Sequence, residues 1–222
     1  MKDFVKKEVA FERVIFFSDA IVAIAITLLA LDLRLEIPPD RHISFSDLLT
    51  PWRNYLAFIL SFINIAGFWR THHNAFVYIY KMDDRMMFLN ICWLFLIVTI
   101  PFATTLVSAH FGETPVIFLY SMNVLGLAVF QNSIWDYADA KKYIDKEKLP
   151  ETKRSWFRLI FNLDMINSLV SVILSFFFPI LAFIFLFFKL PMFLFGTFYM
   201  TGKRRKRFMP SPKTDTDKPV EP

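Results

Sequence analysis

Apolar residues along the chain fall into six long runs that are separated by short polar segments. The runs are 14–33, 56–78, 86–108, 116–135, 157–177 and 179–200. Each run is close to the roughly 20 residues that an α-helix needs to cross a bilayer. The pattern therefore predicts an all-α membrane protein whose residues 1–202 form one domain of six transmembrane helices.

The breaks between the runs carry helix-ending signals. Pro38-Pro39 follows the first run, a Gly- and Pro-containing turn at 111–115 separates the third run from the fourth, and Pro179 interrupts an otherwise continuous apolar stretch. The last run contains Lys189 and Pro191, which a lipid-facing helix should avoid, so the pattern leaves open whether it is a regular span. The polar loop after the first run predicts a short interfacial helix around 44–49.

Composition narrows the class of protein further. The 222 residues are 55% hydrophobic and 20% charged, and they include 28 Phe and a single cysteine, Cys92. These values exclude a disordered chain, a disulfide-stabilised scaffold and an ordinary cytosolic enzyme. The first run is followed by Leu33-Arg34-Leu35-Glu36 and not by a small-residue cleavage site, so we expect a retained span and not a signal peptide.

The basic residues indicate how the chain is oriented. Of the 25 Lys and Arg residues, all but Arg34, Arg41, Arg53 and Lys189 lie in the N-terminal flank, at the second and fourth connections, or after the last run. Because basic residues collect on the cytoplasmic side, we expect a multi-pass protein of the cell membrane with both termini in the cytoplasm. The segment 203–222 is then a cytoplasmic tail, basic at first and disordered afterwards. Topology explains the positive charge, so no nucleic-acid partner is expected.

The first run carries a narrow apolar stripe. At about 100° per residue, five side chains fall within a sector of about 60°; they are Phe17, Ile24, Leu28, Leu31 and Leu35. A second stripe of small residues lies beside it, namely Ala20, Ala23, Thr27 and Ala30. Periodicity alone is compatible with a buried core helix, whereas the ionisable Arg13 and Asp19 at its start favour a functional helix, since charged groups at the membrane edge usually serve a purpose.

Several motifs in the first half of the chain resemble the transmembrane protein 175 family of potassium channels, in its prokaryotic single-repeat form. The first is Arg13-x-x-x-Phe17-Ser18-Asp19, which runs directly into Ala23-Ile24-Ala25-Ile26-Thr27-Leu28-Leu29. The others are Trp69-x-x-His72-His73-x-x-Phe76, Asn90, Trp93-Leu94 and Ile100-Pro101-Phe102. The second half matches the family only in the number and placement of its spans.

This resemblance implies a six-span subunit whose first helix lines the central pore of a homotetramer. The implied pore constrictions are Ile24, Leu28 and Leu31, and Thr27 corresponds to a threonine linked to selectivity. The resemblance also suggests a polar network that holds the pore helix at the cytoplasmic ends of the first three helices. Its expected members are Arg13, Phe17, Ser18, Asp19, Trp69, His72, His73 and Asn90.

The predicted function is a potassium-selective, or weakly selective, cation channel in the lipid bilayer. The five glycines include no Thr-Val-Gly-Tyr-Gly loop, so a carbonyl-lined filter is not expected, whereas rings of Ile and Leu can gate by excluding water. K⁺ would be the permeant ion, with no cofactor and no metal site.

The sequence leaves one alternative class of function open and disfavours another. The alternative is a proton- or cation-coupled transporter that uses Asp19, Asp164 and the two adjacent His residues, although inverted repeats are not visible in the sequence. For Asp164 itself, an interhelical hydrogen bond is the default expectation. An enzyme is not expected, because no pair of a nucleophile and a base stands out.

Overall fold

The computed structural model describes residues 2–35, 40–145 and 147–191, with side chains from Phe11 onward. Most of the described chain is helical, and the one bridge between extended residues joins Ile79 to Ile144. The predicted tail, 203–222, lies outside the described residues. Residues up to Leu190 form one compact unit.

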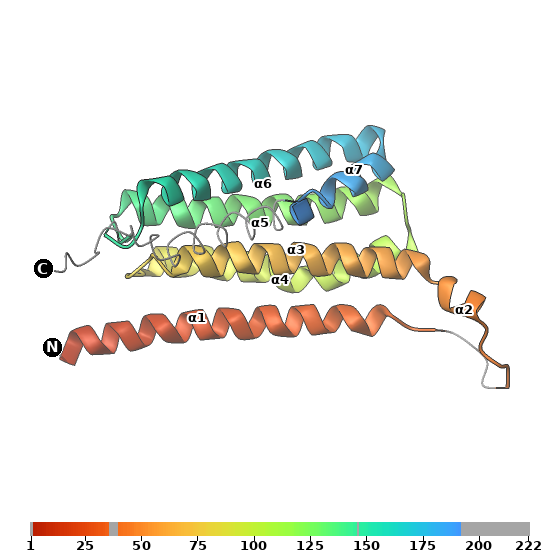
Figure 1. Ribbon diagram of the computed structural model, residues 1–222, viewed down its shortest axis with the longest axis horizontal. Coiled ribbons are helices and arrows are strands. Elements are labelled where there is room, and N and C mark those ends of the chain that lie inside the picture. Colours follow the sequence, from red (N-terminus) through yellow and green to blue (C-terminus); the bar gives the residue numbers. More distant parts are fainter. Residues whose placement is uncertain (1, 36–39, 146, 192–222) are drawn as a thin grey trace, which may run out of the picture. The chain divides into compact units, whose positions relative to one another are not determined.

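Five long helices run side by side in this unit (Figure 1). The elements in chain order are α1 (Lys2–Leu29), the 3-10 turn η1 (Ala30–Asp32), α2 (Phe45–Leu49), α3 (Trp52–Phe76), α4 (Asp84–Ala109), α5 (Thr114–Ala140), α6 (Glu151–Phe177) and α7 (Pro179–Leu186).

The first five predicted spans coincide with the long helices, and each of these helices begins before its apolar run. Among the described residues, four stretches are long and apolar enough to cross a membrane: Phe11–Asp32, Asp84–Ala109, Thr114–Ala140 and Glu151–Phe177. Helix α3 is of similar length, but its polar side chains, such as Asn64, Arg70 and His72, lower its mean hydropathy. The all-α class and the presence of membrane-spanning helices are therefore confirmed.

The sixth predicted span differs from the expectation in its described part. Helix α7 begins at Pro179, where a missing N–H costs nothing, and ends at Leu186. The remainder of the predicted run, 192–200, lies outside the described residues. The short helix predicted around 44–49 is present as α2, and Ser44 and Asp47 form a reciprocal capping box at its start. Its place at a membrane interface stays a prediction.

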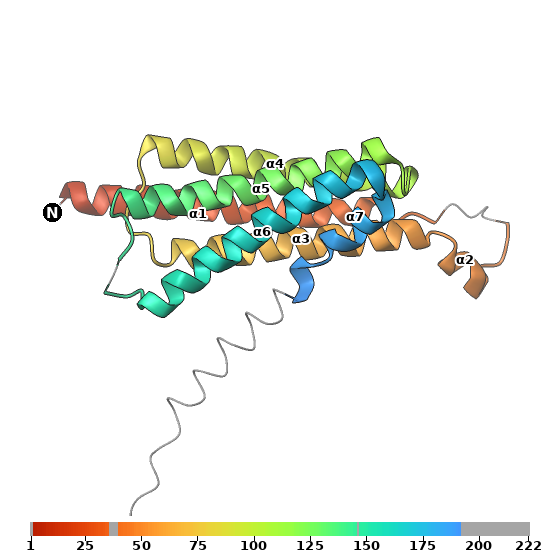
Figure 2. The same ribbon diagram turned by 90° about the horizontal axis from the view of Figure 1, so that it is seen from above.

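The helices pack in a chain of neighbours. Helix α1 packs against α3 and α4, α4 against α5, and α5 against α6, while α7 folds back along α6 (Figure 2). The loops at 77–83 and 141–150 also meet, since the backbone N–H of Tyr80 donates to the carbonyl of Tyr143 at 3.0 Å. Helix α1 therefore lies at one edge of the bundle, with neighbours on one side.

Candidate functional site

Helix α1 has one buried face and one exposed apolar face. Ser18, Val22, Ala25 and Leu29 are at most 2% exposed. On the other side, Ile24 and Leu28 of α1 and Leu31 of the adjoining η1 are 58%, 41% and 57% exposed. These three residues are the predicted constriction, and they point away from the rest of the chain.

Thr27 and the small residues of the second predicted stripe lie on the same exposed side of α1. Thr27, Ala20, Ala23 and Ala30 are all exposed. The Thr27 hydroxyl donates to the carbonyl of Ile24 at 2.8 Å, which leaves its exposed oxygen free to accept. The exposed face thus combines large apolar side chains with one oxygen acceptor.

Asn90 on α4 lies at the centre of the buried anchor of α1. Its Nδ2 donates to the Ser18 hydroxyl at 2.9 Å, and that hydroxyl donates to the carbonyl of Val14 at 2.9 Å. Its Oδ1 lies 2.8 Å from Nε2 of His72 on α3. Because an amide oxygen can only accept, Nε2 of His72 carries the proton. Asn90 therefore connects α1, α3 and α4, and it is only 1% exposed.

Two aromatic rings fix the imidazole of His72 in the core. The ring is stacked at 4.2 Å from Trp93 and at 4.3 Å from Phe76, measured between ring centroids. The imidazole is stacked between two rings and hydrogen-bonded to Asn90, so we interpret His72 as a structural residue and not as a metal ligand. In the described part of the chain, no three His, Cys, Asp or Glu side chains come together in a way that could hold a metal ion.

A second anchor lies beside the first. Nε1 of Trp69 donates to Oδ1 of Asp19 at 2.8 Å and so ties α3 to α1 next to Ser18. Five of the eight expected network residues, Ser18, Asp19, Trp69, His72 and Asn90, thus form hydrogen bonds between helices.

Three residues of the expected network do not take part in these bonds. Arg13 and His73 are exposed, and the His73 ring lies 5.5 Å from the Trp69 ring without stacking on it. Phe17 is 58% exposed and belongs to the same face as Ile24. A role for these three residues stays a prediction, because the motif gives sequence positions and not the face of the helix on which each side chain lies.

Sequence reasoning missed a second polar cluster in the bundle, between α3, α4 and α5. The Tyr120 hydroxyl lies 3.0 Å from the Ser61 hydroxyl, which lies 2.6 Å from the Thr104 hydroxyl. Thr104 donates to the carbonyl of Ile100, so the donors run in order from Tyr120 through Ser61 to Thr104. The sequence signal for this cluster is one polar residue on the buried face of each helix: Ser61 on α3, Thr104 on α4 and Tyr120 on α5.

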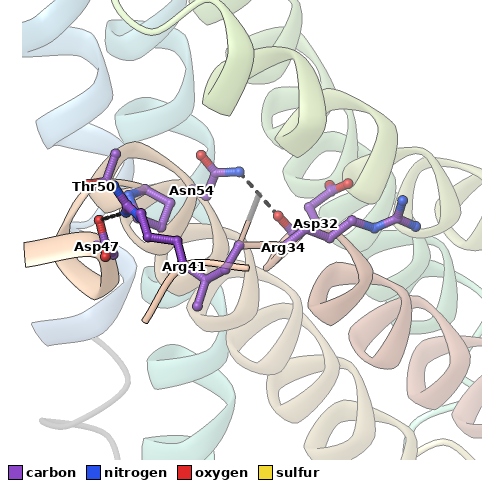
Figure 3. Close-up of a pocket in the computed structure, with 8 residues that line it drawn as sticks. Asp32, Arg34, Arg41, Asp47, Thr50 and Asn54 are labelled. Atoms are coloured by element: carbon purple, nitrogen blue, oxygen red, sulfur yellow. Dashed lines mark hydrogen bonds and ion pairs between the residues drawn. The ribbon is translucent and has the colours of Figure 1, made fainter. Parts of the chain in front are cut away.

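A pocket of about 680 Å³ lies at the other end of α1 and was not predicted. Its lining is mixed in charge and comprises Asp32, Arg34, Leu35, Arg41, Asp47, Thr50, Pro51 and Asn54. Figure 3 shows the amide of Asn54 directed at the backbone carbonyl of Asp32, at 3.1 Å, with the ion pair of Arg41 and Asp47 on the other side. The Thr105 hydroxyl on α4 donates to the Asp32 carboxylate at 2.5 Å. These contacts hold the end of α1 against α3 and α4.

Comparisons with known proteins agree with the motif analysis. The family model described as "Endosomal/lysosomal potassium channel TMEM175" matches residues 13–101. A potassium channel of Streptomyces collinus is 31% identical over 127 residues, which cover 55% of this chain and 62% of that protein. A potassium channel of Chamaesiphon minutus is 32% identical over 133 residues, covering 57% of this chain and 64% of the relative. The matched stretch thus spans less than two thirds of either relative.

Solved structures extend the similarity to most of the fold. The crystal structure of a lysosomal potassium-selective channel TMEM175 homolog from Chamaesiphon minutus matches with a TM-score of 0.67 at 27% identity. The match covers 84% of this chain and 97% of that one. Together these matches confirm the resemblance that the motifs between Arg13 and Phe102 predict.

Proposed function

We propose that this chain, a relative of the TMEM175 family, is one subunit of a cation channel whose pore is lined by the exposed face of α1. The observation that carries the proposal is that Ile24, Leu28 and Leu31 are exposed on a helix that is otherwise anchored by buried polar contacts. A helix anchored on one face and apolar on the other can present its free face to a central axis.

One helix cannot enclose a pore, so the proposal requires several copies around a closed axis. We propose a homotetramer, as the family resemblance implies. The small exposed residues Ala20, Ala23 and Ala30 support close approach between copies, because small side chains let helices pack tightly within a membrane.

The proposed gate consists of rings of Ile24, Leu28 and Leu31, one residue from each copy. When the rings are narrow they exclude water and ions, and when they widen both can enter. Thr27 lies between the levels of Ile24 and Leu28, and its exposed oxygen can replace a water ligand of a passing cation. We propose K⁺ as the preferred ion, since the bacterial relatives are named potassium channels.

The buried contacts have a matching role in the proposal. The bonds from Asn90 to Ser18 and from Trp69 to Asp19 hold α1 at a fixed rotation, so that Ile24 and Leu28 face the axis. We propose that the chain crosses the cell membrane six times, with both termini in the cytoplasm. The distribution of Lys and Arg supports this topology.

The variant Ile24→Asn, reconstituted into liposomes, tests the proposed constriction. We expect a severalfold rise in ion leak and a loss of the preference for K⁺ over Na⁺, because an amide at the constriction removes the barrier to wetting. The measurement is dye-reported flux under opposed K⁺ and Na⁺ gradients.

Ile173→Asn is the matched control, since Ile173 is 52% exposed on α6 and lies outside the proposed pore. Unchanged flux and ion ratio in Ile24→Asn, or the same change in both variants, would contradict the proposal. Single-channel recording separates a channel from the carrier alternative, because a carrier saturates and gives no unitary currents. Relatives in vertebrates are named proton channels, so a proton gradient belongs in the same assay.

A further inference from the structure

Lys189 and Asp164 form an ion pair inside the bundle. Nζ of Lys189 lies 2.7 Å from Oδ2 of Asp164, and the two residues are 6% and 5% exposed. The interhelical bond expected for Asp164 is thereby confirmed, and its partner is the lysine that made the last run irregular. A charge in an apolar interior is tolerated only when it is paired. Removing either residue therefore leaves the other as an uncompensated buried charge, which destabilises the fold.

The pair lies beside the C-terminal end of α7, where other polar groups also meet. The last carbonyls of a helix lack partners within the helix. Asn167 of α6 donates to the carbonyl of Phe185 at 3.1 Å, and Asn64 of α3 lies 3.4 Å from the carbonyl of Leu186. The end of α7 is therefore bound to α6 and to α3 by side-chain amides.

Lys189 also contacts α3 directly, at Gly67 and Phe68. A Cβ atom at Gly67 would lie 2.8 Å from Cγ of Lys189, so a larger residue at this position would displace the lysine stem. Nζ of Lys189 lies 3.1 Å from the centroid of the Phe68 ring, in a cation–π contact. The lysine is thus held between Asp164 and one turn of α3.

The same turn of α3 holds the pore helix. Trp69 follows Phe68 directly, and its indole donates to Asp19 of α1 at 2.8 Å. One short stretch, 67–69, is therefore contacted by Lys189 on one side and by α1 on the other. A rigid helix that shifts at Gly67 carries Trp69 with it.

We propose that Asp164 and Lys189 are a positioning pair, which sets the place of α3 at 67–69 and, through Trp69 and Asp19, the place of the pore-lining face of α1. The inference rests on the proposed function only in naming that face as the pore. Removing one partner leaves the other charge buried without compensation, which disturbs the packing of the segment around Lys189 against α3. Removing both charges leaves no uncompensated charge.

The test measures the position of α1 by the reactivity of a thiol. The parent is Ile24→Cys with Cys92→Ser, reconstituted in liposomes and labelled with a water-soluble, positively charged thiol reagent. We expect Lys189→Met and Asp164→Asn each to change the labelling rate about threefold or more, and the double neutral variant to return to the parent rate. Phe188→Met, next to Lys189 but 48% exposed, is the matched control and should label like the parent.

Gly67→Ala covers the case in which a single-charge variant does not fold. It keeps both charges and displaces the lysine stem, so we expect the labelling rate to differ from that of the parent by less than threefold. A double-mutant cycle with Trp69→Phe then tests whether the effect reaches α1 through α3. If α3 carries the effect, the changes from Lys189→Met and Trp69→Phe are not additive.

Three results would overturn the proposal: equal labelling in all charge variants, a double neutral variant as altered as the single ones, or additive effects with Trp69→Phe. Failure of the proposed function is a separate result, because parent protein that conducts no cation can still be labelled at Ile24→Cys. If the charge variants alter labelling but the parent conducts no cation, the positioning role of the pair is supported and the proposed channel function is contradicted.

Discussion

Single side chains in the loops decide how the ends of the helices are held, and Asp83 is the clearest case. It precedes α4 and accepts from the backbone N–H of Met86 at 2.9 Å, as a helix N-cap does. It also accepts from the hydroxyls of Tyr137 at 2.6 Å and Tyr143 at 3.1 Å. Burial by itself would raise the pKa of Asp83, but these hydrogen bonds outweigh it and hold the pKa below its ordinary value.

The Asp83 carboxylate predicts a pH-dependent contribution to stability. Because the pKa is lower in the folded chain, the contribution is present above the ordinary pKa of 3.8 and is lost as the pH falls through the lowered value. We expect Asp83→Asn to lower the melting temperature by about 3 °C at pH 7 and by less near pH 3, where part of the contribution of the charge is already lost, while Asn still serves as an N-cap. Thermal unfolding in detergent at both pH values is the measurement. An equal shift at both would show that the charge is not involved.

The contacts between elements rest on polar residues that each helix places on its buried face. Asn90 joins α1, α3 and α4, whereas Ser61, Thr104 and Tyr120 join α3, α4 and α5. Neighbouring helices gain little from burying apolar surface when lipid is equally apolar, so such bonds carry much of the specificity. The sequence motif pointed to Asn90, but only the packing shows that one amide serves three helices.

Replacing Asn90 by Leu tests this junction. The variant keeps a similar volume but leaves Nε2–H of His72 buried without an acceptor, which costs about 2 kcal/mol. We expect a melting temperature lower by about 4–8 °C in detergent. Asn74→Leu, half-buried on α3, is the control and should change it little. An equal drop in melting temperature for Asn74→Leu and Asn90→Leu would show that the Asn90 junction contributes no more to stability than an ordinary half-buried Asn.

At the scale of the whole molecule, the free apolar face of α1 is the feature that a single chain leaves unexplained. Phe17, Ile24, Leu28 and Leu31 lie on this face, while α3 and α4 cover the opposite face of the helix. The proposed tetramer places this face around an axis and so gives it both neighbours and a function.

Native mass spectrometry of the detergent-purified protein tests the assembly. We expect a species of four times 26.2 kDa for the wild-type chain. Ala23→Trp should shift it toward smaller species, because a large side chain on the small-residue stripe prevents close approach. A monomer from wild-type protein in several mild detergents would exclude the pore described above.

The sequence by itself determined the helical class, the positions of the five long helices and the short helix at 45–49, because hydrophobic runs and capping residues act locally. It also placed Ile24, Leu28 and Leu31 on one side of the first helix, since helical periodicity acts without reference to neighbours. That this side is exposed and not buried is visible only in the tertiary structure. Only the tertiary structure decided which polar residues meet. Arg13 and His73 match the motif as well as Asp19 and His72 do, yet they point outward. Likewise, the partner of Asp164 lies 25 positions along the chain, just after α7, and this pairing depends on how α7 folds back and is specified by no local pattern.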